Sequence, residues 1–158
     1  MSKILELDTI LSQWAENVIA KIQLNLESTG TNASGRTSAS LDYEITDTGL
    51  IISGRQYFQG VEQGRPGGRV PYRFQDVIRQ WMEDKGIANQ FGSTESAKRS
   101  AAYLIAKFID EHGTKLYREG GRDDIFTSVF EEELPKLEEE VAIEVNRIVL
   151  TELDKVAK

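Results

Sequence analysis

The sequence predicts an α+β fold with a long N-terminal helix, a small antiparallel sheet built on a hairpin, and several helices ending in an acidic C-terminal helix. Three patterns predict it: a helical apolar stripe at the start of the chain, a short stretch of alternating apolar and polar residues, and a glutamate-rich helical stripe at the end. The 158 residues are the length of one ordinary domain. We therefore expect a single domain over residues 1–158 with one hydrophobic core.

The N-terminal helix is predicted over residues 1–27 because apolar side chains recur there every three or four positions. These residues are Ile4, Leu7, Leu11, Trp14, Val18, Ile22 and Leu26. The segment STGTNASG, residues 28–35, is polar and rich in turn formers, so we expect an exposed loop after the helix.

A hairpin and a basic loop are predicted over residues 36–73. Apolar and polar residues alternate from Ala39 to Thr46, a turn follows, and Leu50-Ile51-Ile52 returns as the second strand. The segment after Gly54, RQYFQGVEQG, fits either a third short strand or a turn of helix. The loop GRPGGRVPYR, residues 64–73, then combines turn residues with three arginines.

Two helices are predicted over residues 74–112. Gly86 suits the end of the first, and Ser93 or Thr94 suits the start of the second. The first is defined by Phe74, Val77, Ile78 and Trp81, and in the second the residues expected to face the core are Ala101, Leu104, Ile105 and Phe108.

An acidic helical tail is predicted over residues 123–157, after a loop at 114–122. Pro135 either kinks this helix or lies in the first turn of a separate last helix. The apolar stripe of the tail consists of Leu137, Val141, Val145, Ile148, Val149, Leu153 and Val156.

Charge is distributed unevenly along the chain. Residues 123–158 hold 11 acidic and 4 basic residues, whereas the first 122 residues hold 15 of each. This acidic field repels polyanions. The first ten residues are not a continuous apolar run, no stretch of 18 apolar residues occurs, and there is no cysteine, so we expect neither secretion nor a membrane span.

The sequence lacks the residue patterns of common catalytic and cofactor sites. His112, the only histidine, lies at a predicted helix end, where the helix dipole favours an imidazolium. No serine lies in a G-x-S-x-G pattern, the glycine-rich loop has no lysine for a Walker-type phosphate site, and no calcium-loop spacing occurs. Neighbouring acids on a helix usually form a solvated face. We therefore predict no enzyme activity, no cofactor and no metal.

Arginines and aromatic residues alternate around the basic loop. They are Arg55, Tyr57, Phe58, Arg65, Arg69, Tyr72, Arg73 and Phe74. Such a surface suits either stacked bases and phosphates or the carboxylates of a protein partner. The acidic total favours a protein partner, and a nucleic-acid-binding module is the alternative.

The order of these features resembles the tail-completion, or head-to-tail joining, proteins of tailed bacteriophages. A first stretch of that family is matched by Gly35, Arg36, Ser40 and Leu41, and a second, Tyr-x-x-x-Val-Glu-x-Gly, by Tyr57, Val61, Glu62 and Gly64. The stretch GTKLYREGGRDDIF, residues 113–126, is similar to the C-terminal segment of some neck proteins. A long acidic helical tail replaces the short strand and proline-rich ending frequent in the family.

The resemblance implies a structural virion protein, made in the host cytoplasm, that forms a ring in the neck between head and tail. Its implied partners are further copies of itself, the portal or adaptor protein, and tail proteins, with a passing contact with genomic DNA left open. It implies an α+β fold and no catalysis.

Ring closure requires two different, complementary patches on each subunit. We expect basic loops to form one patch and acidic C-terminal helices around residues 131–140 the other; alternatively, the loops bind an adjacent neck ring. The predicted interface residues are Arg36, Arg55, Tyr57, Glu62, Arg65, Arg69, Tyr72, Arg73, Glu131, Glu132 and Glu139.

Overall fold

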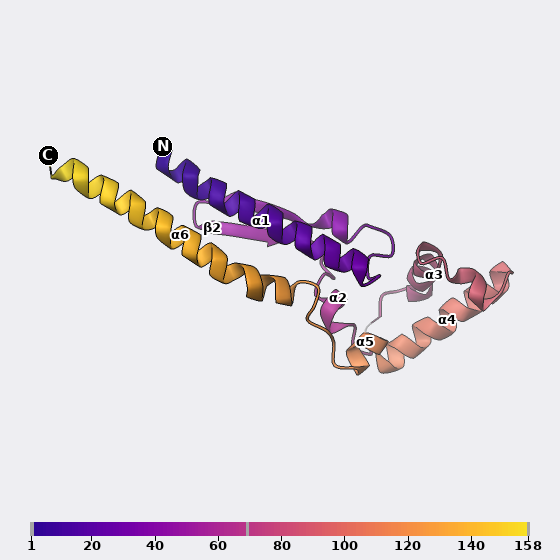
Figure 1. The fold of residues 1–158 in the computed structure, drawn as a ribbon. Helices are drawn as coiled ribbons and strands as arrows, with labels where there is room; N and C mark the ends of the chain where they lie inside the picture. The colour runs from indigo at the N-terminus through magenta and orange to yellow at the C-terminus, as the bar shows by residue number, and fades with distance from the viewer. Residues whose placement is uncertain (1, 69, 158) are drawn as a thin grey trace.

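The computed structural model describes residues 2–68 and 70–157, and it confirms the predicted α+β fold (Figure 1). Its helices are α1 (Ser2–Ser28), α2 (Gly60–Gln63), α3 (Phe74–Asp84), α4 (Glu95–His112), α5 (Lys115–Arg118) and α6 (Thr127–Val156). Strands β1 (Asp42–Thr46) and β2 (Gly49–Ser53) form the sheet, and two 3-10 turns are η1 (Ser38–Ser40) and η2 (Ala88–Phe91).

A first hydrophobic core lies between α1, α6 and the hairpin. The two long helices run side by side in opposite directions, so both chain ends lie at the same end of the molecule (Figure 1). The apolar stripe of α1 faces α6, because residues four apart share one face of a helix. The buried members of this core are Trp14, Val18, Ile22, Leu26, Ile125 and Val129.

The predicted hairpin is confirmed from Asp42 to Ser53, but the start of its predicted first strand is the 3-10 turn η1. Its two strands are antiparallel, Tyr43 pairs with Ile52, and Ile45 pairs with Leu50. Leu50 and Ile52 pack against the first core, and the Tyr43 hydroxyl donates a hydrogen bond to Glu16 on α1 at 3.0 Å. The hairpin therefore buries one face on α1, as its alternating sequence predicts.

A second hydrophobic core lies between α3, η2 and α4, so the prediction of one core is wrong. Its buried residues are Phe74, Ile78, Met82, Ala88, Ala102 and Ala106. Thr94 caps α4 by accepting a hydrogen bond from the Ala97 amide at 3.2 Å, as predicted. Gly86 follows α3 with φ +69°, also as predicted.

The side of α4 that packs against α3 matches the prediction only in part, because Ala101 and Ile105 pack against the second core as predicted but Leu104 and Phe108 lie outside it. Leu104 and Phe108 are 63% and 46% exposed, whereas Ala102 and Ala106 are buried. Helix α4 is apolar on two sides, and periodicity alone does not say which side packs. The small alanine side chains let the large residues of α3 approach closely, which leaves the larger side chains outside.

Two chain segments join the two cores and lie side by side. Residues 62–68 lead from α2 towards α3, and residues 110–122 lead from α4 towards α6. The Thr114 amide donates to the Arg65 carbonyl at 2.9 Å, and the Arg122 amide donates to the Glu62 carbonyl at 2.8 Å. The segment after Gly54 is thus turns and the short helix α2, and the predicted loop 114–122 contains α5.

The tail is one continuous helix that begins at Thr127, and Pro135 lies inside it. The alternative of a separate last helix is therefore wrong.

Glycine at position 64 is required by a close approach of the two joining segments. Gly64 has φ +71°, and a side-chain carbon there would collide with the backbone of Tyr117. Gly35 has nearly the same φ of +73°, but nothing lies within 4 Å of the equivalent position. A substitution at Gly35 therefore measures only the strain of left-handed backbone, whereas one at Gly64 adds the steric clash with Tyr117.

We predict that Gly35→Ala lowers the free energy of unfolding by about 1 kcal/mol through backbone strain alone. Gly64→Ala should cost at least about 2 kcal/mol more, because the joining segments must move apart. Urea denaturation of both variants measures the difference. Equal losses would show that the close approach contributes nothing.

Candidate protein-interaction surface

Four of the predicted interface residues are exposed on the basic loop or in the segment that leads to it. Tyr57 is 70% exposed and Tyr72 is 94% exposed. Arg73, at the start of α3, has φ +58° and forms an ion pair with Asp76 at 2.6 Å. Tyr57 and Arg65 line the same hollow of about 400 Å³, which opens beside the joining segment. Arg55 is also exposed, just before this hollow.

Two other predicted arginines make contacts within the chain. Arg36 forms an ion pair with Asp84 at 3.1 Å, which connects the loop after α1 to the end of α3. The Arg65 guanidinium carbon lies 5.3 Å from the centre of the Phe74 ring, a cation–π contact. Arg69 lies outside the described residues.

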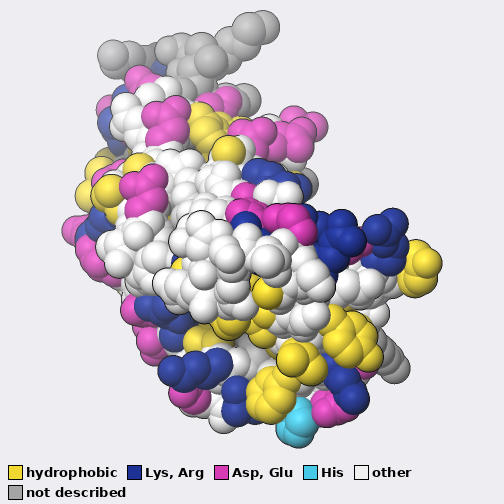
Figure 2. All heavy atoms as spheres, turned by 90° about the vertical axis from the view of Figure 1, so that its right-hand side faces the viewer, with side chains coloured by type: hydrophobic (Ala, Val, Ile, Leu, Met, Phe, Trp, Pro, Cys, Tyr) yellow, Lys and Arg dark blue, Asp and Glu magenta, His cyan; other side chains and the backbone are white. Residues whose placement is uncertain are grey.

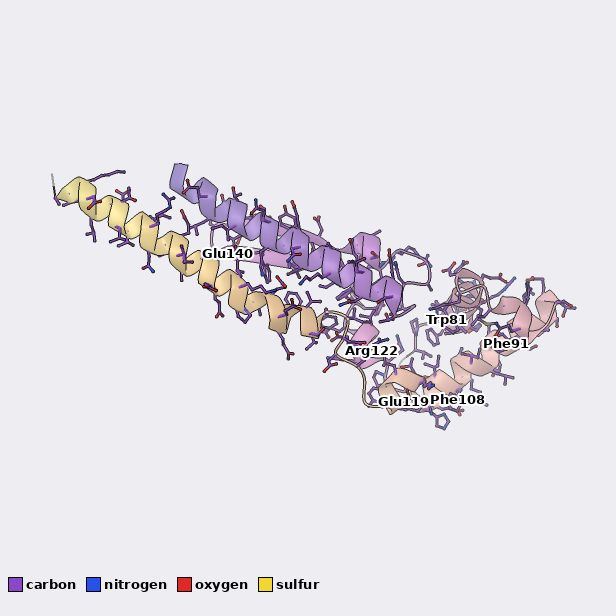
Figure 3. The ribbon with its side chains drawn as sticks, in the orientation of Figure 1. Trp81, Phe91, Phe108, Glu119, Arg122 and Glu140 are labelled. Carbon is purple, nitrogen blue, oxygen red and sulfur yellow. The ribbon has the colours of Figure 1, made fainter. Side chains whose placement is uncertain are left out.

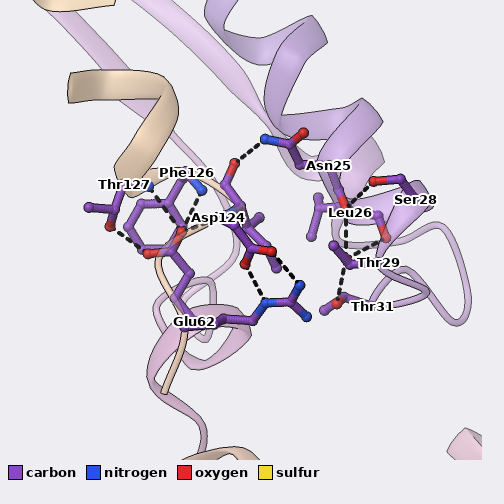
Figure 4. Close-up of polar contacts among 11 residues, drawn as sticks. Asn25, Leu26, Ser28, Thr29, Thr31, Glu62, Asp124, Phe126 and Thr127 are labelled. Atoms are coloured by element: carbon purple, nitrogen blue, oxygen red, sulfur yellow. Dashed lines mark hydrogen bonds and ion pairs between the residues drawn. The ribbon is translucent and has the colours of Figure 1, made fainter. Parts of the chain in front are cut away.

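Glu62 is buried, which corrects its predicted place at an interface. Its side chain is 3% exposed, and its carboxylate accepts the backbone amides of Ile125, Phe126 and Thr127 at 2.9, 2.6 and 3.0 Å (Figure 4). The Thr127 hydroxyl donates to the same carboxylate at 2.5 Å. Glu62 therefore satisfies the unpaired amides at the start of α6 and places a negative charge at the positive end of its dipole.

Sequence reasoning missed this contact because it spans more than 60 residues. Local capping patterns act within one helix, and no such pattern connects Glu62 with residues 125–127. One signal was available in the sequence. The N-cap residue of α6, Phe126, has no side-chain acceptor for the first amides of the helix, so an acceptor from elsewhere in the chain is needed.

Glu132 is exposed but already paired within the chain. It accepts from Lys21 and Lys136 at 3.0 Å each, and the 3% exposed Glu133 accepts from the same lysines at 2.6 and 2.7 Å. The hydrogen bond from Lys136 has the largest effect and that from Lys21 the next largest. Together they lower the pKa of Glu132 to about 2, and they also lower the pKa of Glu133. This cluster connects α1 to α6 across the first core.

Glu131 and Glu139 are exposed on α6 and have no ion pair with another described residue. Of the predicted acidic patch, these two carboxylates remain open to a partner, whereas Glu132 is shared with the two lysines. Figure 3 places their neighbour Glu140 on the same long helix, far from Trp81 and Phe108 at the other end of the molecule.

Net charge differs in sign between two parts of the chain. Residues 54–122, which carry α2 to α5, hold 12 basic and 8 acidic residues, a net charge of +4. The remaining residues, 1–53 and 123–158, hold 7 basic and 18 acidic residues, a net charge of −11. The first 122 residues have no net charge because residues 1–53, at −4, balance residues 54–122, at +4.

Exposed aromatic side chains gather on the basic side of this division. Figure 2 shows hydrophobic and basic side chains close together there, beside the single histidine. Among the described residues, every large aromatic side chain that is exposed lies within 54–122. They are Tyr57, Tyr72, Trp81, Phe91, Tyr103, Phe108 and Tyr117. Aromatic residues and arginine are enriched at protein interfaces, so this half of the molecule has the composition of a contact surface.

His112 lies in the last turn of α4, where the sequence predicts it. Its ring stacks on Phe108 with centres 4.5 Å apart, and its Nδ1 lies 3.2 Å from the Phe108 carbonyl oxygen. Within the described part of the chain, no cluster of three or more potential metal ligands occurs. No described helix has both the length and the apolar character needed to cross a membrane.

We predict that Glu62→Ala lowers the free energy of unfolding by about 3 kcal/mol, because it leaves several amides at the start of α6 without an acceptor. Glu139→Ala, on the exposed face of α6, should change it by less than about 0.5 kcal/mol. Urea denaturation of the two variants provides the comparison. A loss for Glu62→Ala as small as that for Glu139→Ala would contradict the assigned role.

We also predict that acid weakens the fold through the lysine-glutamate cluster. The folded-state pKa of Glu132, about 2, lies below its ordinary value of 4.5. Its contribution to stability is therefore present above pH 4.5 and is lost as the pH falls towards about 2. Lys21→Met should reduce the fall in unfolding free energy over this range, whereas Lys115→Met, whose partner Glu119 lies 3.7 Å away, should not. Denaturation series at several pH values test this, and parallel curves for all three proteins would argue against it.

Comparison with protein-family models, with curated proteins and with solved structures found no match for this chain.

Proposed function

We propose that this protein is a structural component of a tailed-phage virion, where copies form a ring in the neck that joins the head to the tail. The observation that supports this proposal most is that three residues of the matched motif Tyr-x-x-x-Val-Glu-x-Gly have structural roles in this fold. Val61 packs on the first core, Glu62 holds the start of α6, and Gly64 permits the close approach of the two joining segments. A motif with these roles characterises a fold, and the fourth residue, Tyr57, is left exposed for contact.

The residues of the first matched stretch have comparable roles. Gly35 has a left-handed backbone, and Arg36 connects to Asp84. The Ser40 hydroxyl accepts the Arg55 amide at 3.2 Å, and Leu41 packs against the first core. Most residues of both matched stretches therefore have roles in the fold, and Ser40 and Leu41 lie where the hairpin ends, which supports the resemblance as one of fold.

A neck ring needs surfaces that bind a neighbour, and this chain offers such surfaces. Arg55, Tyr57, Tyr72 and Arg73 supply exposed guanidinium and aromatic groups on the basic side. Exposed carboxylates on α6, including Glu131 and Glu139, supply the opposite charge. Because these groups occupy different parts of the subunit, contacts between them generate a head-to-tail series, and such a series closes into a ring when the rotation from copy to copy completes a full turn.

Nucleic-acid binding is the second candidate function, and one observation favours it. Arg73, Arg79 and Arg99 line a hollow of about 450 Å³ together with Tyr103. Guanidinium groups and an aromatic ring suit phosphates and a stacked base. Two of these arginines are paired with acids, Arg73 with Asp76 and Arg79 with Glu95, which reduces the field available to a phosphate.

We predict that the purified protein forms closed rings in native mass spectrometry and negative-stain images, and that Arg55→Glu with Arg73→Glu weakens them. The reason is that a glutamate at either position repels the exposed carboxylates on α6 of the neighbouring copy. As a matched control, Asp42→Arg with Asp47→Arg reverses two exposed charges on the hairpin and should leave the rings intact. A protein that remains monomeric at all concentrations, or is recovered only bound to short single-stranded DNA, would count against the ring.

A further inference from the structure

We propose that the hollow between α3 and α4 is a binding site for the phosphate group of a nucleotide. Its charged and aromatic lining residues are Arg73, Asp76, Arg79, Arg99 and Tyr103. Its volume of about 450 Å³ suits a small ligand, since such sites measure roughly 300–1,000 Å³. This site does not depend on the proposed ring, and it goes beyond the second candidate function because a free nucleotide can occupy it as well as a strand.

The two helices direct their charged side chains to the same hollow. Asp76 and Arg79 lie three positions apart on α3, and Arg99 and Tyr103 lie four positions apart on α4, so each pair shares one face of its helix. Arg73 precedes α3 and lines the same space. Three guanidinium groups and one carboxylate give the lining a net charge of +2.

Arg99 is the lining arginine without an acidic partner in the described part of the chain. Its helical neighbour four positions earlier, Glu95, instead pairs with Arg79 and lies 3.6 Å from Lys98. Asp76, the one acid of the lining, pairs with Arg73 at 2.6 Å. Both acids are therefore already bound, and the exposed Arg99 guanidinium remains for an added anion.

The lining suits a phosphate better than a carboxylate. A phosphate group carries up to two negative charges and three strong acceptor oxygens, whereas a carboxylate has one charge and two oxygens. The planar fork of arginine binds phosphate through two parallel hydrogen bonds. Several guanidinium groups around one hollow can therefore share a phosphate.

Tyr103 indicates a nucleotide rather than a bare phosphate. Its ring is 57% exposed, and it also lines an adjoining hollow of about 280 Å³ that shares Arg73 with the first. A base stacks favourably on an exposed aromatic ring. Asp110 and Glu111 line the adjoining hollow as well, and carboxylates repel phosphate. We therefore place the phosphate beside Arg99 and the base against Tyr103.

The test measures binding of a fluorescein-labelled oligothymidylate by fluorescence anisotropy in about 0.1 M salt, with thymidine monophosphate and inorganic phosphate as competitors. We expect both competitors to displace the strand, thymidine monophosphate at the lower concentration. Arg99→Ala should weaken binding of all three probes at least about tenfold, because it removes a charged contact to the phosphate. Tyr103→Ala should weaken thymidine monophosphate and leave inorganic phosphate unchanged.

The matched control is Lys115→Ala, which removes a positive charge from the same basic region at an exposed position outside the hollow. It should change binding less than about twofold, because salt screens a distant charge. The replaced side chains are exposed, so all three variants should keep the wild-type circular dichroism spectrum.

Three results would overturn the site. They are no binding of any phosphate probe, equal losses in Arg99→Ala and Lys115→Ala, and an Arg99-dependent binding of a labelled polyglutamate peptide alone, which would assign the hollow to a protein carboxylate. Rings in native mass spectrometry without phosphate binding would overturn this site and leave the proposed ring standing. Phosphate binding by a protein that is always monomeric would support this site and count against the ring.

Discussion

The fold depends on one buried carboxylate that holds the start of the longest helix. Glu62 accepts three consecutive backbone amides at the N-terminus of α6, and its own backbone carbonyl accepts the Arg122 amide. A buried carboxylate is costly unless hydrogen bonds replace its water, and these donors do so. The same residue therefore fixes the position of α2, the start of α6 and the direction in which the chain returns from α5.

This constraint keeps the two joining segments side by side and the two cores apart. The chain leaves the first core through residues 62–68 and returns through residues 110–122, so everything between forms a separate helical unit. A second connection comes from Arg36, which binds Asp84, and from Lys85, which donates to the Gly30 carbonyl. Two connections limit rotation of the helical unit about the joining segments, so its exposed side chains are presented in a defined direction.

The local parts of the fold could be predicted from the sequence, and its long-range parts could not. The stripe of α1, the alternation of the hairpin, the Thr94 cap and Gly86 are each encoded by neighbouring residues, and the structure has all four. The division into two cores depends on which side of α4 packs, and a helix that is apolar on two sides does not encode that choice. The Glu62 contact joins residues 63 positions apart, which no local pattern connects.

The candidate surface was predictable to a similar extent. Exposure of Tyr57, Tyr72 and Arg73 agrees with the turn-rich composition around them, because turns carry their side chains outward. Arginine composition did not distinguish Arg73, whose partner Asp76 lies three positions away, from Arg36, whose partner Asp84 lies 48 positions away. The charges themselves were visible in the sequence, but their separation depends on the fold, which returns the acidic tail to the N-terminal helix.

The proposed self-association depends on the separation of acidic and basic residues across the subunit more than on any single residue. A subunit with an acidic surface along the first half of α6 and a basic, aromatic surface on residues 54–122 is attracted to further copies in a head-to-tail orientation and repelled in the symmetric ones. Salt screens such attraction over roughly 10 Å at 0.1 M, so charge can orient the encounter but cannot alone hold a lasting contact. The exposed aromatic side chains within residues 54–122, Tyr57 and Tyr72 among them, can supply the burial that charge lacks, and they lie in the region of net charge +4, so attraction and burial favour the same contact.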